Sequence, residues 1–335
     1  MTPRRRIIPV FVPHLGCPND CVFCNQRTIS GSLRPAGPQD VVKALKEARG
    51  KTEGAELAFY GGSFTNLPEE QQRALLEAAQ PYREEGFLQS IRVSTRPDAV
   101  TAEKLALLKA YGVETVELGA QSMDDRVLRL SGRGHTAADT TAAASLVKAA
   151  GMHLILQMMT GLPGASPEGD LHTAQALAAL RPDGVRIYPT VILRGTALEA
   201  LWRAGKYRAH TVSDAVETCA PIAAIFLREG VPILRLGLNP TETLSGGEAV
   251  GGAYHPALGE MVYSKLYLDL ARAKLRSMRR LPRKVELQVA SNRVSQMTGR
   301  KQANLLALRW EFGLEEVSVS GGAFLPETVE IRKIL

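Results

Sequence analysis

The sequence predicts an α/β fold, an open (β/α)6 partial TIM barrel of parallel strands followed by a small C-terminal α/β appendage. Short apolar runs alternate with helical patterns over the first two thirds of the 335-residue chain, as in βαβ units. Only six such units can be counted, which is too few to close an eight-stranded barrel. Glycines and polar residues follow nearly every predicted strand, where parallel sheets bind their ligands.

The predicted strands are short runs rich in aliphatic residues. They lie at Ile7–Val12, Glu56–Tyr60, Ser90–Ser94, Thr115–Leu118, His153–Met158 and Val185–Tyr188. Helical patterns between them lie at Gln39–Ala48, Pro68–Tyr82, Ala102–Ala110, Ala137–Ala149 and Glu168–Ala179. Thr101 supplies a capping hydroxyl ahead of the third of these helices.

The sequence changes character after residue 237. We therefore divide the chain into a core domain, residues 1–237, and a C-terminal extension, residues 238–335, as a candidate substrate-binding region. The glycine-rich stretch 239–252 is expected to form a linker or an active-site loop. Beyond it we expect a helix over residues 260–280, strands at Val285–Val289 and Glu316–Val319, and a helix at Asn304–Phe312.

The composition is that of an ordinary globular protein, with 45% hydrophobic and 22% charged residues. No stretch is long and apolar enough to predict a membrane span. The run Arg4-Arg5-Arg6 precedes an apolar segment, but Pro9 and Pro13 interrupt that segment, which argues against a signal peptide. We therefore expect a cytoplasmic protein with no membrane partner.

Three of the four cysteines, Cys17, Cys21 and Cys24, lie within eight residues. A secreted disulfide framework would use an even, dispersed set, so this cluster indicates a metal centre in a reducing compartment. Thiolates suit iron–sulfur clusters or zinc. A [4Fe-4S] cluster normally takes four thiolates, so three leave one iron open to another ligand. Cys219 lies in an apolar helical pattern and is expected in the core.

Zinc is the alternative metal. The three cysteines and His14 form a Cys3His set of the kind found in structural zinc sites. All four ligands would then come from one eleven-residue stretch, whereas structural zinc usually joins two distant segments. The pattern therefore favours the iron–sulfur cluster.

The CxxxCxxC stretch follows the first predicted strand and carries Phe23 before its last cysteine. In this it resembles the radical S-adenosylmethionine (SAM) superfamily, whose partial barrel matches the predicted fold. In that family the open iron binds SAM, and reduction of the cluster cleaves SAM to a 5′-deoxyadenosyl radical. The resemblance implies a radical SAM enzyme with a [4Fe-4S] cluster and S-adenosyl-L-methionine as cofactors. It also implies an external electron donor of the flavodoxin or ferredoxin type.

Later motifs extend the resemblance to the SAM site. Gly61, Gly62 and Ser63 follow the second strand, where the family carries a Gly-Gly-Glu motif that binds the SAM amino group. Gln121 and Arg133 match residues that contact the SAM ribose and its carboxylate, and a guanidinium suits a carboxylate. The alternatives are an ordinary βα turn for the glycines and a solvated surface position for Arg133.

The order of the later motifs resembles the catalytic subunit of Elongator and, more distantly, oxygen-independent coproporphyrinogen dehydrogenase. The resemblance spans about residues 7–237, including Gln121-Ser122, Ser131–Thr136, Met158–Gly164 and Arg186–Thr190. Three features differ from the Elongator subunit. The first two cysteines are more closely spaced, Ser94 replaces an acidic residue associated with the ribose, and nothing after residue 238 resembles an acetyltransferase domain.

Ten basic residues and only one acid, Glu286, lie between Arg272 and Lys301. Such a cluster is typical of a phosphate-binding surface, although a solvated helical face is the alternative. The segment has no aromatic residue on which bases could stack. The resemblance to the Elongator subunit, an enzyme acting on tRNA, together with this basic surface implies tRNA as the substrate. A small acidic metabolite such as a tetrapyrrole is the alternative. A non-catalytic, metal-stabilised RNA-binding protein is the competing class.

Overall fold

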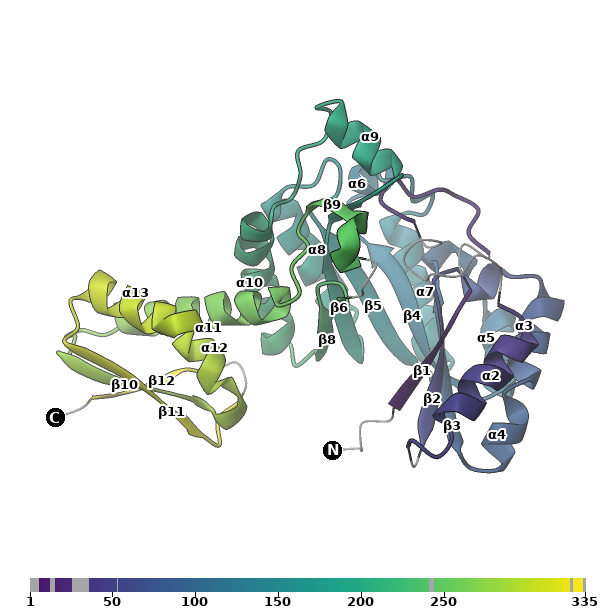
Figure 1. The fold of residues 1–335 in the computed structure, drawn as a ribbon, viewed down its shortest axis with the longest axis horizontal. Coiled ribbons are helices and arrows are strands. Elements are labelled where there is room, and N and C mark those ends of the chain that lie inside the picture. The colour runs from purple at the N-terminus through teal and green to yellow at the C-terminus, as the bar shows by residue number, and fades with distance from the viewer. Residues whose placement is uncertain are drawn as a thin grey trace.

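The structure, a computed structural model, describes residues 6–12, 16–25, 36–52, 54–240, 244–325 and 328–333. Its main sheet holds seven parallel strands in the order β1-β2-β3-β4-β5-β6-β8. They are β1 (Arg6–Phe11), β2 (Ala55–Tyr60), β3 (Leu88–Thr95), β4 (Val113–Gln121), β5 (His153–Thr160), β6 (Gly184–Pro189) and β8 (Ile233–Leu236). The predicted partial barrel is confirmed, and Figure 1 shows its strands curving across the molecule.

Helices connect these strands along the outer side of the barrel (Figure 1). They are α2 (Pro38–Ala48), α3 (Glu69–Glu77), α4 (Gln80–Glu84), α5 (Ala102–Ala110), α6 (Asp125–Leu130), α7 (Ala137–Ala149), α8 (Pro167–Ala179) and α10 (Val212–Arg228). Thr101 caps α5 as expected, since its side chain accepts a hydrogen bond from the Lys104 N–H at 3.3 Å.

Two predictions about these elements differ from the structure. The single helix expected over 68–82 is divided into α3 and α4. Pro81 lies in the first turn of α4, a place that suits a residue without an N–H. The seventh strand, β8, was not predicted because it has only four residues and leaves Leu234 exposed. Its apolar pattern is therefore too short to be recognised.

The hydrophobic core of the barrel combines side chains from strands and helices, including Leu57 and Phe59 of β2, Leu76 of α3 and Leu105 of α5. Burial of each such side chain contributes roughly 1.5–3 kcal/mol. None of the described helices is long and apolar enough to cross a membrane.

The C-terminal appendage combines helices and strands, as predicted, but its sheet has three strands, whereas only those at Val285–Val289 and Glu316–Val319 were expected. β10 (Lys284–Ala290) lies in the middle, parallel to β11 (Glu316–Gly322) and antiparallel to β12 (Glu330–Lys333). The helices α12 (Val294–Thr298) and α13 (Ala303–Phe312) connect β10 to β11. Figure 1 shows the appendage beside the barrel, on the side of β8.

One long helix, α11 (Leu258–Arg276), belongs to both hydrophobic cores. Leu258, Val262 and Leu266 lie in the core of the barrel. Tyr267 and the residues that follow it at helical spacing lie in the core of the appendage. The two cores therefore separate inside α11, whereas the boundary after residue 237 stays a prediction about domains.

Candidate functional site

A cavity of about 590 Å³ opens at the carboxyl ends of the barrel strands. Its wall brings together seven of the eight predicted site residues, Cys17, Cys21, Cys24, Gly61, Gly62, Gln121 and Arg133. These residues come from four separate segments of the chain. The strand ends bring them together because all seven strands run in the same direction.

The cysteine loop, residues 16–25, is held by its backbone. The Val22 N–H donates to Ser131 O at 3.1 Å, and Val22 O accepts the Leu198 N–H at 2.8 Å. Gly16 has φ +70°, and a Cβ there would collide with Ser63 O. Only glycine allows the loop to approach the end of β2 so closely.

A small apolar cluster covers the other side of the cysteine loop. β7 (Val191–Leu193) pairs with β9 (Ala249–Gly252), and α9 (Ala197–Arg203) follows β7. Val22 and Phe23 of the loop pack against Ile192 and Leu198 in this cluster. Part of the predicted glycine-rich loop thus forms β9 and helps to hold the cysteines, while Thr241 and Glu242 lie outside the described residues.

The three thiols are partly buried and free of disulfides. Burial and the neighbouring Cys21 raise the pKa of Cys17, while Arg133 and Arg96 act in the opposite direction. The Arg133 Nη1 donates to the Cys21 Sγ at 3.3 Å. These guanidinium groups would stabilise thiolates, which are the metal-binding form of cysteine.

The geometry bears on the choice of metal. Within the described ranges, no three cysteine, histidine or acidic side chains converge closely enough to hold one metal ion. A [4Fe-4S] cluster needs no such convergence, because each thiolate binds a different iron. The zinc alternative also requires His14, which lies outside the described residues.

Gln121 and Arg133 share the space beside Gly119. A Cβ on Gly119 would lie 2.9 Å from Gln121 Nε2 and 3.3 Å from Arg133 Nη2. The same guanidinium donates to Gly119 O at 2.7 Å. Gln121 itself has φ +64°, a left-handed conformation that is strained for glutamine and is often found at functional sites.

Several polar atoms at the cavity lack a partner in the part of the chain that the structure describes. They are Gln121 Oε1, Arg133 Nε and Arg96 Nη1, and all three are buried. An unsatisfied buried polar group costs about 1–3 kcal/mol, so these atoms favour a polar ligand. Cations, an amide and three thiols form a donor set that fits a [4Fe-4S] cluster and a ligand with carboxylate and hydroxyl groups, as SAM has.

Ser63 is the exception among the predicted site residues. Its side chain is fully buried, with Oγ 2.9 Å from Thr95 Oγ1. The same Oγ accepts the Arg96 N–H at 3.2 Å. The hydroxyl is therefore occupied in joining β2 to β3, and only the backbone of Ser63 remains for a ligand.

Sequence reasoning missed a buried ionic network in the barrel interior. The Glu117 carboxylate has no exposed surface and accepts hydrogen bonds from Arg92 at 2.7 Å, Arg186 at 2.9 Å, Gln157 at 2.9 Å and Tyr60 at 3.1 Å. Burial alone would raise the pKa of Glu117, but the two arginines outweigh it and hold that pKa below its usual value. Charged residues in the middle of apolar strands were the signal that could have revealed it.

His135 was also missed, although it lies in the stretch after Arg133. Burial and the nearby Arg133 charge lower the pKa of His135 to about 4, so its ring is neutral near pH 7. Its Nε2 lies 3.2 Å from the backbone oxygen of Ala120, the residue that precedes Gln121 in β4. His135 therefore supports the strand end that carries Gln121.

Comparison with known proteins identifies the class of protein. The model of the Radical SAM superfamily matches residues 11–177, and that of the Radical_SAM C-terminal domain matches residues 182–267. Together the two matches cover most of the chain. The chain belongs to the radical SAM superfamily and is an enzyme whose cofactors are a [4Fe-4S] cluster and S-adenosyl-L-methionine.

Within that superfamily the chain is similar to Elongator complex protein 3. It is 33% identical to that protein of Mus musculus over 204 residues, 55% of this chain and 37% of the relative. It is 26% identical over 255 residues to the tRNA uridine(34) acetyltransferase of Dehalococcoides mccartyi (strain CBDB1), 65% of this chain and 56% of the relative. The chain thus spans well under two thirds of the length of either relative.

Solved structures show the same fold. The archaeal Methanocaldococcus infernus Elp3 superposes with a TM-score of 0.62 at 22% identity, covering 81% of this chain and 63% of that one. The coproporphyrinogen III oxidase of Escherichia coli superposes with a TM-score of 0.51 at 20% identity, covering 68% and 54%. Both likenesses concern the fold.

Proposed function

We propose that this enzyme uses radical SAM chemistry to modify an RNA, with tRNA as the favoured substrate. The observation that carries the chemistry is one cavity lined by three thiols, two glycines, Gln121 and Arg133. When bound, the reduced cluster and SAM supply a 5′-deoxyadenosyl radical. An external donor of the flavodoxin or ferredoxin type would supply the electron.

The residues of the cavity have distinct proposed roles. The thiols of Cys17, Cys21 and Cys24 hold the cluster. The backbone of residues 61–63 faces the SAM amino group, Arg133 pairs with its carboxylate, and Gln121 bonds the ribose. Since Arg133 also donates to the Cys21 Sγ, one side chain would join the cluster site to the SAM site.

Two findings support RNA as the substrate. One relative of this chain is named as an enzyme acting on tRNA uridine. The other is the surplus of cations in the appendage, although it is smaller than the sequence suggests. Glu311, Glu330, Glu315 and Glu316 form ion pairs with half of the ten basic residues, Arg272, Lys274, Arg276, Arg283 and Lys284.

A small acidic metabolite is the second candidate, and the cavity itself favours it. Arg186 and Arg235 line its wall together with Tyr188, although the Arg186 guanidinium is already paired with Glu117 and that of Arg235 donates to Gly237 O and Leu238 O. Guanidinium groups that line a cavity suit the carboxylates of a small molecule. This candidate predicts that the free enzyme binds such acids without any nucleic acid.

The radical chemistry is tested with anaerobically reconstituted protein. We expect the visible absorption of an iron–sulfur cluster and release of 5′-deoxyadenosine after addition of dithionite and SAM. Zinc in place of iron, or SAM that stays intact after reduction, would contradict the proposal.

The substrate is tested in a strain that lacks the gene. Mass spectrometry of its tRNA should show the loss of one modified nucleoside, which a plasmid copy restores. Unchanged tRNA together with an accumulated acidic metabolite would instead support the second candidate.

A further inference from the structure

We propose that the appendage binds single-stranded RNA at the turn between α12 and α13 and along the exposed face of α13. The inference rests on the proposed function for the identity of the nucleic acid as RNA. It adds a binding site outside the cavity and assigns it to named residues, Arg300, Lys301 and Trp310.

The turn has a defined place in the architecture of the appendage. Four residues, Gly299-Arg300-Lys301-Gln302, separate two helices that connect the parallel strands β10 and β11. KH modules bind RNA with a Gly-x-x-Gly loop that clamps the backbone of four nucleotides. Here Gln302 stands at the fourth position, and its φ of +62° is one that glycine would adopt more easily.

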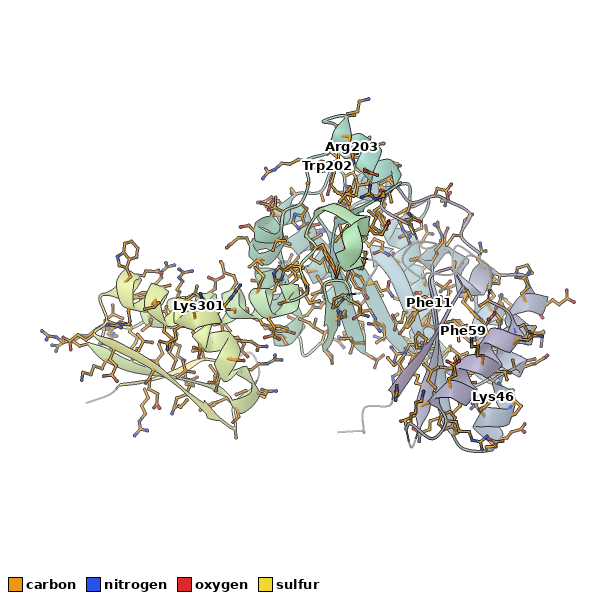
Figure 2. All side chains as sticks on the ribbon, viewed as in Figure 1. Phe11, Lys46, Phe59, Trp202, Arg203 and Lys301 are labelled. Carbon is orange, nitrogen blue, oxygen red and sulfur yellow. The ribbon has the colours of Figure 1, made fainter. Side chains whose placement is uncertain are left out.

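The turn is positively charged. Arg300 and Lys301 are exposed, and no acidic partner is found for either among the described residues. The ion pairs of the appendage instead involve other cations, which include Arg272 on α11 and Arg283 before β10. The turn therefore keeps its positive charge, and this charge attracts the phosphates of a nucleic acid. Figure 2 labels Lys301 on the half of the appendage nearer the barrel.

The helix α13 exposes two large apolar side chains. Trp310 is 90% exposed, and Leu306, four residues earlier on the same face, is 54% exposed. An exposed indole on the helix that begins at the cationic turn suits a nucleic-acid base, because aromatic rings stack on bases of any sequence. The charge at the turn favours RNA over a protein partner for this apolar face.

Hydrogen bonds fix the position of the turn. The buried Asn304 Nδ2 donates to Ser264 O at 2.9 Å and to Gln296 O at 3.1 Å, which ties the start of α13 to α11 and α12. A Cβ on Gly299 would lie 2.9 Å from Asn304 Cγ. The turn is thus fixed before binding, which lowers the entropy that binding must overcome. Ser264 also lies on the helix that continues into the barrel core.

The test uses the cluster-loaded protein of residues 1–335 and a fluorescent single-stranded RNA of mixed sequence, with affinity measured by anisotropy at several salt concentrations. Reversal of both turn charges, Arg300→Glu with Lys301→Glu, should weaken binding at least tenfold. The slope of the logarithm of affinity against the logarithm of salt concentration should become shallower by about 1.4. Each lost phosphate contact accounts for about 0.7 of this slope on a single strand. Trp310→Ala should weaken binding by roughly tenfold.

The matched control is Lys43→Glu with Lys46→Glu on α2, which changes the net charge equally on the barrel and outside the appendage. It should alter the affinity less than threefold. Equal losses in both double variants, or an unchanged affinity of Trp310→Ala, would overturn the site, while tRNA mass spectrometry would test the proposed function independently. If charge reversal disturbs folding, Arg300→Gln with Lys301→Gln is expected to give a smaller loss in the same direction.

Discussion

At the scale of single residues, the cysteine loop shows how a short pattern acquires its chemistry. Each thiol is partly buried, and Arg133 and Arg96 stand close enough to favour the thiolate of Cys17. Burial raises the pKa of Cys17 as well, but complete burial of Cys219 raises its pKa to about 12 with no guanidinium group acting against the rise, which leaves this thiol inert. The same residue type therefore has two environments in one chain.

This contrast predicts the effect of removing each thiol. Cys17→Ala, Cys21→Ala and Cys24→Ala should each reduce bound iron after anaerobic reconstitution to a small fraction of that in the unmodified protein. Cys219→Ala is the matched control and should keep the full iron content. Iron and sulfide analysis with visible spectra measures both. Loss of iron from the Cys219 variant alone would contradict the assignment.

Removal of Arg133 should weaken SAM binding. A charge-assisted pair contributes roughly 1.5–3 kcal/mol, so Arg133→Ala should raise the SAM dissociation constant by about 10- to 150-fold in equilibrium dialysis. Because its Nη1 also contacts the Cys21 Sγ, iron content must be measured in the same sample. Arg129→Ala, an exposed arginine nearby, serves as the control, and equal affinities in the two variants would remove Arg133 from the site.

At the scale of elements, the strands of the barrel carry an ionic network that no single strand explains. Glu56, Arg92, Glu117 and Arg186 come from four strands, and the salt bridges between them measure 2.7–2.9 Å. Each of these strands supplies one charged residue to the network and also carries buried apolar residues, such as Leu57, Ile91 and Leu118. The network therefore depends on the register of neighbouring strands.

Breaking this network should be costly. Glu117→Ala leaves Arg92 and Arg186 without their shared carboxylate, and loss of one partner of a buried ion pair typically costs about 3–5 kcal/mol. Urea denaturation should show that loss in the free energy of unfolding. The exposed pair Arg73–Glu69 on α3 is the control, and Glu69→Ala should have no measurable effect. Similar stabilities of both variants would contradict the structure.

Asp170 in α8 predicts a dependence of stability on pH. Burial raises its pKa to about 7, although the Gly161 N–H donates to its carboxylate at 2.9 Å. The unfolded chain loses this proton near pH 4, so the folded state binds more protons between pH 4 and 7. Stability should therefore fall as pH rises through this window, by up to roughly 4 kcal/mol.

The measurement compares the protein with Asp170→Asn in urea denaturation at pH 5 and pH 8. The amide keeps an acceptor for Gly161 but does not titrate, so the variant should gain stability relative to the protein at pH 8. A constant difference between the two proteins at both pH values would show that Asp170 does not titrate in this range.

At the scale of the whole molecule, α11 joins the barrel to the appendage. Its first half is buried in the core of the barrel and its second half in the core of the appendage. A chain ending at Pro256 should aggregate, because it uncovers the apolar barrel surface under Leu258, Val262 and Leu266. A chain ending at Arg276 should keep this cover and fold.

The comparison is made by gel filtration and iron content. The chain ending at Arg276 needs polar substitutions at Tyr267, Ala271 and Leu275, because the side chains that pack against these residues are removed with the appendage. It should then retain the cluster and lose RNA binding. If the chain ending at Pro256 is equally stable and monomeric, the barrel does not depend on α11.

Much of the fold and of the candidate site follows from the sequence alone. Alternating apolar runs predict six of the seven barrel strands, and the close spacing of Cys17, Cys21 and Cys24 predicts the cluster loop. These features are local: a strand depends on its own side chains, and ligands on one loop meet without help from distant parts of the chain. The Elongator-like order of motifs predicts where the loops of the SAM site lie.

Other properties depend on which segments meet in space. The four residues of β8 form a strand because they pair with β6, and the apolar pattern of so short a segment does not predict a strand. Contacts with Thr95 and Arg96 bury the Ser63 hydroxyl, and glutamates from distant segments neutralise half of the basic cluster. Hydrogen bonds and ion pairs act over a few ångströms, so partners far apart in the sequence are decided only by the tertiary structure.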